Sequence, residues 1–374
     1  MTHDGLARAV VCRGARQCAV EELPVPGDLA GGALVKVEAA AVCGSDWEHY
    51  TDPRFFERGA VVLGHENVGR IVAIDAAYPA SHVAVGDRVI VEEFVPCGNC
   101  AACQEGASGR CPATDFRRPG TLRYGRTPID RGPGLWGGFS ELLYVHPRTR
   151  MHRVPEGLDP HVAAFANPVA NGLRWLGEVA GLRAAQHVLV IGPGAHGLGT
   201  ALAARALGAS LVAVVGLDRD AVRLADAKQL GADVTLRADA DDVQRELREA
   251  TSGHGVDIVV DLTPGSTDTV ELAVRVTAPG GRVLLAGHKG RPGPVTVDEV
   301  ARKELALLGV RGPTSRSIAA SVDVLSRYAH RVADLATASC SLDEAERALR
   351  LVGREIGPEV SHVVVDPRSR AGHA

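Results

Sequence analysis

The sequence predicts an α/β protein with two domains, a mostly-β region followed by a doubly wound parallel sheet. The 374 residues exceed what a single hydrophobic core usually holds. The first part of the chain contains short apolar runs broken by glycine, proline and aspartate, a pattern typical of β-strands and turns. Beyond about residue 160, fully apolar strands alternate with helical patterns, which indicates a parallel sheet with helices on both faces.

Three strands are predicted in the first region: Ala33–Val42, Gly69–Ile74 and Asp87–Val91. The segment from Arg153 to Pro160 contains two prolines and a glycine, which predicts a passage between the domains. Four apolar strands follow: Val188–Ile191, Leu211–Val215, Val256–Leu262 and Arg282–Ala286. Helical patterns occupy Leu198–Leu207, Ala221–Leu230 and Thr267–Thr277. An amphipathic helix at Ser341–Leu351 precedes a last strand at His362–Val365, which we expect to return to the first domain.

Four cysteines lie close together in the first region: Cys97, Cys100, Cys103 and Cys111. The residues between them are polar and include glycine, so we expect a loop wrapped around an ion. Four thiolates at this spacing suit a closed, structural zinc site. An iron–sulfur cluster is an alternative, because the C-x2-C-x2-C run and the closing Cys111-Pro112 are similar to a ferredoxin motif, although the last spacing is longer here. Disulfide pairs would require an oxidising compartment.

The overall composition is that of an ordinary globular protein. A formal net charge of −4 gives no reason to expect nucleic acid or an anionic membrane as a partner. No apolar run approaches the roughly twenty residues of a membrane span, and the N-terminus lacks the pattern of a signal peptide. Eight cysteines without a secretory signal indicate metal and thiol chemistry in a reducing compartment, so we expect a cytoplasmic protein. Three cysteines outside any cluster are expected to be plain structural thiols: Cys12, Cys18 and Cys340.

A glycine-rich turn follows the predicted strand His187–Ile191 and opens the next helix. It reads Gly192-Pro-Gly194-Ala-His-Gly197, with Leu198 as the next helical residue. In a strand–turn–helix context this pattern is typical of dinucleotide binding. The first glycine permits the turn, the second lets the backbone approach a pyrophosphate, and the third allows close helix packing. The alternative is a turn of an α/β domain that binds no cofactor.

The end of the next strand predicts which dinucleotide is used. Asp218 stands where a carboxylate can accept hydrogen bonds from the ribose hydroxyls, and it would repel a 2′-phosphate. This favours NAD over NADP. The adjacent Arg219 is the kind of residue that a 2′-phosphate would use, so NADP stays open.

A second group of metal-ligand residues comes from two loops, in Cys43-Gly-Ser-Asp46 and Gly64-His65-Glu66. Cysteine, histidine and glutamate suit zinc and can leave a coordination position for a substrate oxygen. Taken alone, this spacing is a weak signal. Together with the other motifs it is specific, because five motifs occur in one order: Cys43-Gly-Ser-Asp, Gly64-His65-Glu66-Asn-Val-Gly, Val85-Gly-Asp-Arg-Val89, the four-cysteine loop and Gly192–Gly197.

In this order of motifs the chain resembles the zinc-dependent medium-chain dehydrogenases, the family that contains alcohol, sorbitol and threonine dehydrogenases. The resemblance covers essentially the whole chain. It implies a GroES-like, mostly-β catalytic domain in residues 1–165, completed by residues 310–374. It also implies a Rossmann NAD-binding domain in residues 166–309.

The resemblance further implies a catalytic zinc held by Cys43 and His65, with Glu66 as a ligand or close neighbour. The fourth position departs from the family, which carries Cys, Asp or Glu where this chain has Asn167. An amide oxygen is a weaker zinc ligand than a carboxylate. We therefore expect Glu66 or water to complete the coordination, with Asn167 nearby. A site without catalytic metal stays an alternative.

The family also implies a route for the proton and the hydride. Zinc at such a site makes a substrate hydroxyl more acidic, and Ser45 matches the hydroxyl that passes the proton outward. The next member of this relay is usually a histidine, but here Glu48 takes its position and His49 follows. The hydride passes to the nicotinamide. His288 follows a predicted strand close to where the family places this ring, and it either contacts cofactor or substrate or caps the strand end.

The substrate is the least determined part of the prediction. By resemblance, Trp47, Glu48, the segment Glu92–Phe94 and Trp136 surround the substrate, which favours a polyol, amino alcohol or aminocyclitol. Five arginines could bind an anionic substrate or form a solvated loop: Arg117, Arg118, Arg123, Arg126 and Arg131.

We therefore expect a zinc-dependent oxidoreductase that acts on a small secondary or polar alcohol with NAD, as a homodimer or homotetramer. The alternatives are an NADPH-dependent carbonyl reductase and a non-catalytic, cofactor-binding protein on the same fold.

Overall fold

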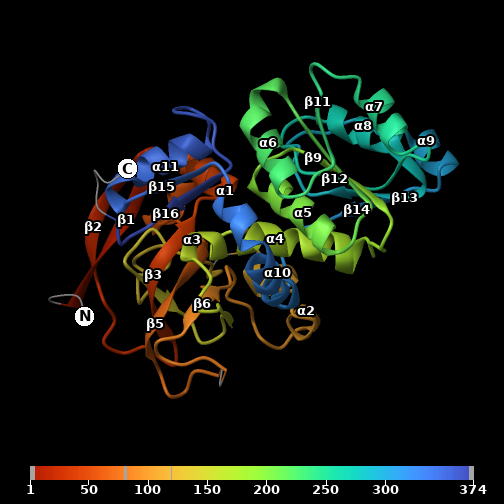
Figure 1. Cartoon of the computed structure of the whole chain (residues 1–374). Helices are drawn as coiled ribbons and strands as arrows, with labels where there is room; N and C mark the ends of the chain where they lie inside the picture. The colour runs from red at the N-terminus through yellow and green to blue at the C-terminus, as the bar shows by residue number, and fades with distance from the viewer. Residues whose placement is uncertain (1–4, 80–81, 119, 370–374) are drawn as a thin grey trace. The chain divides into compact units, whose positions relative to one another are not determined.

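The computed structural model describes residues 5–79, 82–118 and 120–369 (Figure 1). Contacts divide the chain into two compact units. The first consists of residues 1–166 and 325–374, and the second of residues 167–324. Each unit is built around its own sheet, so each is described by itself.

The first unit contains a seven-stranded sheet. Its strands follow the order β15 (Thr337–Cys340), β16 (His362–Val365), β3 (Ala33–Ala41), β5 (Glu66–Ile74), β6 (Arg88–Val91) and β8 (Met151–Arg153), with β7 (Leu142–Val145) also paired to β3. All pairs are antiparallel except β15 with β16. A second, antiparallel sheet has the order β2 (Gln17–Pro24), β1 (Leu6–Gly14) and β4 (Val61–Val62). The mostly-β prediction is confirmed.

Short helices connect these strands: α1 (Gly44–Thr51), α2 (Ala101–Gln104), α3 (Pro160–Ala163) and α11 (Ala345–Val352), with 3-10 turns at Pro53–Arg58, Ser108–Arg110, Pro112–Thr114 and Leu342–Glu344. The C-terminal strand β16 pairs with β3 at Val364 and Ala41. The predicted return of the chain end to the first domain is therefore confirmed. The core between the sheets contains the fully buried aromatic rings of Tyr124, Trp136 and Phe139.

Two expectations for this unit are wrong. The segment from Arg153 to Pro160 does not pass between the units, because α3 after it still packs on β3 and β5. Cys12 and Cys18 are not plain thiols but form a disulfide. The antiparallel register of β1 and β2 places these two cysteines directly opposite each other, and spacing alone does not reveal that register. Cys340 is a buried free thiol, as expected.

The second unit contains a six-stranded, fully parallel sheet. Its order is β11 (Val234–Arg237), β10 (Leu211–Gly216), β9 (His187–Ile191), β12 (Val256–Asp261), β13 (Thr277–Leu285) and β14 (Ala306–Gly309). The helices are α4 (Ala166–Leu173), α5 (Ala195–Ala206), α6 (Ala221–Gln229), α7 (Val243–Ala250), α8 (Asp268–Val276) and α9 (Val297–Arg302), with a π-helical turn at Arg174–Val179. A further helix, α10 (Ser315–Ala333), begins in this unit and ends in the first. The predicted Rossmann sheet is confirmed, and its strand order reverses between β9 and β12, where such sheets bind dinucleotides.

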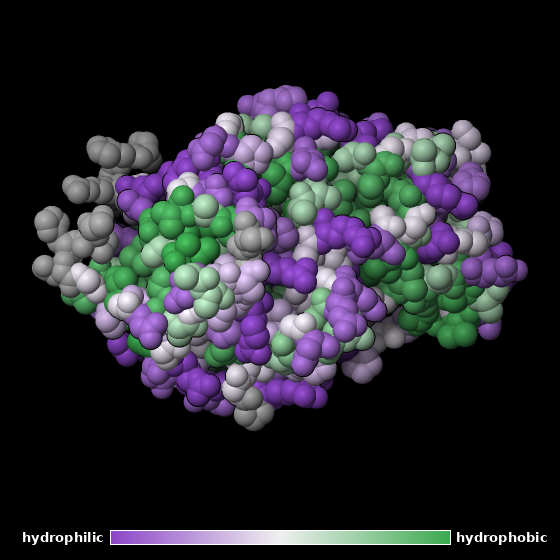
Figure 2. Space-filling model, turned by 90° about the horizontal axis from the view of Figure 1, so that it is seen from below, coloured by the Kyte–Doolittle hydropathy of each residue, from purple (hydrophilic) through white to green (hydrophobic). Residues whose placement is uncertain are grey.

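No helix in the described parts of the chain has the length and apolar character needed to cross a membrane. Figure 2 shows hydrophilic residues over much of the face that it views, with apolar patches between them.

Candidate metal centres and cofactor site

The strand register brings three metal-ligand side chains together. Ala41, at the end of β3, pairs with Glu66, at the start of β5. The chain beyond Ala41 therefore runs past His65 and Glu66, and Cys43 follows as the cap of α1. The ligand atoms of Cys43, His65 and Glu66 all lie within 4.8 Å of one another. His65 is 6% exposed and Glu66 is 7% exposed, so this trio is largely shielded from water.

A buried carboxylate holds the histidine of the trio. Asp46 Oδ1 lies 3.2 Å from His65 Nδ1, and the same side chain accepts hydrogen bonds from the backbone N–H groups of Cys43 and Gly64. Burial alone would lower the pKa of His65, but the charges of Asp46 and Glu93 hold it well above its usual value. The negative field around this imidazole favours a cation beside it. The donors of the trio, thiolate, imidazole and carboxylate, fit zinc.

The other ring nitrogen of His65 faces two further side chains. Ser45 Oγ lies 3.5 Å from Nε2, and Glu93 Oε1 lies 3.9 Å from it. The preceding Gly64 has a positive φ of 88°, and a Cβ there would lie 2.6 Å from the ring of Phe139. A glycine is therefore required before His65, because both the backbone conformation and the packing exclude a side chain.

The two predicted relay residues have different surroundings. Glu48 is exposed on α1, whereas His49 is 8% exposed and stacks on Phe55 with 4.1 Å between ring centres. His49 Nε2 accepts a hydrogen bond from Arg126, and its Nδ1 has no hydrogen-bond partner. Burial and the charge of Arg126 lower the pKa of His49 to about 3. The structure thus places His49 in a buried position and Glu48 in contact with solvent. A role of either residue in a proton relay stays a prediction.

The two tryptophans predicted around the substrate have packing partners of their own in the first unit, and their place beside the substrate stays a prediction. Trp47 packs against Gly353 and under the guanidinium of Arg16, on a different face of α1 from Asp46. Trp136 is buried in the core, and its Nε1 donates to Arg131 O at 2.7 Å.

The neighbouring glutamates point to different partners. Glu92 pairs with His152 at 2.8 Å, while Glu93 reaches His65 and accepts from Arg123 Nε at 2.6 Å. Asp46 and Glu93 were not predicted as neighbours of His65. The signal present in the sequence was the aspartate within the Cys43 motif.

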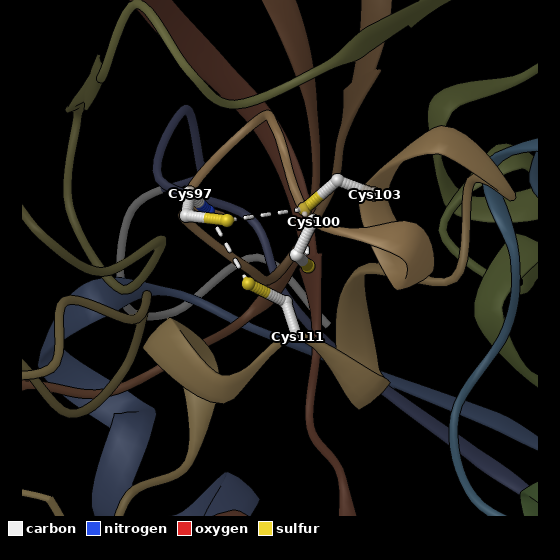
Figure 3. A group of neighbouring side chains, drawn as sticks. All are labelled: Cys97, Cys100, Cys103 and Cys111. Carbon is white, nitrogen blue, oxygen red and sulfur yellow. Dashed lines mark hydrogen bonds between the residues drawn. The ribbon is translucent and has the colours of Figure 1, made fainter.

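The four-cysteine cluster is assembled as predicted (Figure 3). The four sulfur atoms of Cys97, Cys100, Cys103 and Cys111 lie within 4.8 Å of one another, and no disulfide joins any of them. Cys97 Sγ is 3.8 Å from Cys103 Sγ, which is 3.5 Å from Cys100 Sγ. Backbone N–H groups lower the pKa of Cys97 to about 6, so its thiolate forms readily. Four converging sulfurs fit a closed tetrahedral metal site.

The glycine motif forms the predicted strand–turn–helix. Gly192 has a positive φ of 103°, and α5 begins after Gly194, which caps it. A Cβ at Gly197 would lie 2.0 Å from Gly192 O, whereas one at Gly194 would meet nothing within 4 Å. The space at Gly194 is what a pyrophosphate approaching the backbone requires. Leu198 is buried and its N–H donates to Gly194 O, so it anchors the helix.

The predicted ribose-binding carboxylate follows β10. Asp218 is exposed, and its Oδ1 accepts a hydrogen bond of 3.0 Å from Arg237 Nη1 at the end of β11. Arg219 is also exposed. Arg237 was not predicted, because it reaches this position only through the pairing of β10 with β11.

The two remaining predicted residues, His288 and Asn167, both belong to the second unit. His288 is exposed, and its carbonyl accepts from Gly265 N. The next residue, Lys289, donates to the buried Asp261 at 2.8 Å and so fixes this loop to the end of β12. Asn167 lies in the first turn of α4 in the second unit, so its place beside the trio stays a prediction.

Comparisons with known proteins agree with this arrangement. A model of the alcohol dehydrogenase GroES-like domain matches residues 30–156, and one of zinc-binding dehydrogenases matches residues 196–327. A protein of Mycobacterium tuberculosis named probable alcohol dehydrogenase is 37% identical, over 98% of this chain and 100% of that protein. An erythritol/L-threitol dehydrogenase of Mycolicibacterium smegmatis is 31% identical, over 92% and 94%.

A solved structure has the same fold. It comes from Sinorhizobium meliloti, is a zinc-binding dehydrogenase by name, and is bound to NADP. It has a TM-score of 0.81 and 26% identity, over 97% of this chain and 99% of that chain. The similarities therefore extend over both units.

Proposed function

Because this chain belongs to the zinc-dependent medium-chain dehydrogenases, we propose that it transfers a hydride between a secondary or polar alcohol and NAD with the help of zinc. The observation that carries this proposal is the trio of Cys43 with the buried His65 and Glu66, whose ligand atoms lie within 4.8 Å of one another. A thiolate, an imidazole and a carboxylate at this separation match the donors of catalytic zinc sites.

The trio would hold one zinc ion, with water completing the coordination. When bound, zinc polarises the substrate oxygen and makes an alcohol proton easier to remove. Asp46 fixes the orientation of the His65 ring through Nδ1, which leaves Nε2 for the metal. Ser45 Oγ, 3.5 Å from Nε2, is placed to accept a hydrogen bond from the alcohol, and it would pass its own proton outward as it takes up the alcohol proton.

The four-cysteine loop would hold a second, structural zinc. Four protein ligands leave no position for substrate, so its role is to fold the loop. The nicotinamide carries the hydride, and the Gly192–Gly197 turn would bind its pyrophosphate.

The choice of NAD rests on Asp218, whose carboxylate suits the ribose hydroxyls and repels a 2′-phosphate. Arg237 and Arg219 beside it are the residues that could receive NADP instead. A polyol-like substrate is supported by the relative that acts, by its name, on erythritol and L-threitol. We further propose a cytoplasmic homodimer or homotetramer.

The direct test is turnover by the zinc-loaded protein. We expect NAD-dependent oxidation of four- to six-carbon polyols, and a loss of about hundredfold or more in kcat/KM in Cys43→Ala. Cys340→Ala is the matched control, because it removes a buried thiol that is not part of either cluster. Equal activity in the two variants would refute the proposed site. No turnover by a wild type shown to hold two zinc ions would favour a non-catalytic, cofactor-binding role.

A further inference from the structure

A buried ion pair joins the loops that follow two neighbouring strands of the parallel sheet. Lys289, in the loop after β13, donates to Asp261 Oδ2 at 2.8 Å, and Asp261 is the last residue of β12. The carboxylate is 0% exposed and the lysine side chain is 14% exposed. Because a buried charge is costly without its partner, each of these two side chains holds the other in place.

The ammonium of Lys289 also binds oxygens of the segment that follows β12. Its Nζ donates to Thr263 O at 2.6 Å, to Thr263 Oγ1 at 3.0 Å and to Thr269 Oγ1 at 3.2 Å. Both threonine hydroxyls in turn donate to the carboxylate of Asp261. An ammonium has three N–H donors, and these oxygens share all of them. The donors of Lys289 are therefore engaged within the protein, which indicates a positioning role rather than direct binding of a substrate or a phosphate.

The two loops also meet through their backbones. A Cβ at Gly287, which follows β13, would lie 2.4 Å from Thr263 O, so a side chain there is excluded. The N–H groups of Ala286 and Gly287 both donate to Asp261 O at 3.0 Å. Lys289 lies just beyond this tight contact, and its side chain ties the rest of the β13 loop to the same segment.

This cluster borders the glycine turn that is proposed to bind the cofactor. A Cβ at Gly192 would lie 3.2 Å from Thr263 Cγ2, so the β12 loop packs against the turn. Asp261 pairs with Ile191 at the ends of β12 and β9, where the strand order reverses. A dinucleotide lies across such a switch point, with one half on each side. Asp218, the proposed ribose ligand, follows β10 on one side, so we expect the nicotinamide half on the side of β12 and β13.

We propose that Lys289 is a positioning residue for the nicotinamide half of the cofactor. By joining Asp261 to Thr263 and Thr269, it holds the loops after β12 and β13 in one arrangement before the cofactor binds. A surface that is already ordered loses less conformational entropy on binding, which strengthens the binding. The adenosine half, on the other side of the switch point, does not depend on Lys289. This inference rests on the proposed function, because it takes NAD as the cofactor.

Calorimetric titration of the full-length protein with NAD and with ADP separates the two halves. ADP contains the adenosine and the pyrophosphate of NAD but lacks the nicotinamide. We expect Lys289→Met to weaken NAD binding about tenfold or more and to leave ADP binding unchanged. A lysine that only stabilises the fold would not distinguish between the two ligands.

Lys303→Met is the matched control. Lys303 is also largely buried, with a side chain that is 11% exposed. Its Nζ donates to three carbonyl oxygens at the start of β13, those of Val274, Arg275 and Thr277. This is the end of the strand away from the glycine turn, so we expect a lower Tm with unchanged binding of both NAD and ADP.

A double variant separates binding from stability. Lys289→Met alone leaves Asp261 buried without its cation and lowers the Tm, whereas Lys289→Met combined with Asp261→Asn removes both charges and regains part of the Tm. NAD binding that stays weak in the double variant, with ADP binding intact, supports the inference. NAD binding that returns to the wild-type value would show that the unpaired carboxylate caused the loss, and it would overturn the inference.

Two further results would also overturn it: unchanged NAD binding in Lys289→Met, or equal weakening of NAD and ADP in that variant. Both would leave the dehydrogenase proposal intact. Selective loss of NAD binding in Lys289→Met, in a protein that oxidises no alcohol, would remove the proposed activity and leave the positioning role of Lys289 standing.

Discussion

At the scale of single residues, the site depends on charged groups that meet only in the folded chain. His65 receives Asp46 on one ring nitrogen and faces Ser45 and Glu93 on the other. Asp46 could be found from sequence because it belongs to the Cys43 motif. The contact of Glu93 with His65 could not, because it depends on long-range pairing such as the bridge between Phe94 and Arg123.

The pair of Asp218 and Arg237 predicts how cofactor preference can be changed. Replacing Asp218 with Asn removes the charge that repels a 2′-phosphate and leaves Arg237, which still pairs with Asp241, with one carboxylate partner fewer. We expect the ratio of kcat/KM for NADP to that for NAD to rise about tenfold or more.

The double variant Asp218→Asn, Arg237→Gln is the control for this prediction, and it should lose most of the gain. If the ratio stays unchanged in Asp218→Asn, the carboxylate does not select the cofactor.

At the scale of elements, the β9–α5 turn provides two glycines with opposite surroundings. Gly197→Ala would place a methyl 2.0 Å from Gly192 O, so we expect weaker cofactor binding together with a lower Tm. Gly194→Ala meets no atom within 4 Å, so it should leave the Tm of the apoprotein unchanged while weakening NAD binding about tenfold or more. Calorimetric titration with NAD and thermal unfolding separate the two effects. Normal NAD binding by Gly194→Ala would show that the pyrophosphate does not approach this backbone.

Strand β16 carries a histidine that makes stability depend on pH. Burial lowers the pKa of His362 from 6.5 to about 4, and its side chain is almost fully enclosed. The unfolded chain therefore binds a proton between these pH values that the folded chain does not. This contribution to stability is complete above pH 6.5 and is lost as the pH falls towards 4, by up to about 3 kcal/mol.

Urea unfolding between pH 7.5 and 4.5 measures this dependence. We expect wild type to lose stability on acidification more steeply than His362→Asn. Parallel curves for the two proteins would contradict the assignment to His362.

At the scale of the whole molecule, the second unit was more predictable than the first. The strands of a parallel sheet are buried on both faces, so β9, β10 and β12 stand out as apolar runs between helices. In the first unit, β3 and β5 were found, but the β1–β2 hairpin was not, and its register creates the disulfide between Cys12 and Cys18. This disulfide removes two cysteines from the set that suggested a reducing compartment, so cytoplasmic localisation stays a prediction.

The same contrast holds for the candidate sites. Short motifs predicted both metal clusters and the glycine turn, because their residues are close in sequence or follow a known order. A residue brought to its site only by long-range strand pairing, such as Arg237, carries no local signal of its position.

The central claim is that the first unit holds one structural and one catalytic zinc, and elemental analysis tests it most directly. Zinc and iron per chain are measured for wild type, Cys43→Ala and Cys340→Ala, each purified without added metal. We predict two zinc ions in wild type and in Cys340→Ala, and one in Cys43→Ala. One zinc ion in all three proteins would show that the trio binds no metal and would contradict the account, and iron in the four-cysteine loop would replace its structural zinc with an iron–sulfur cluster.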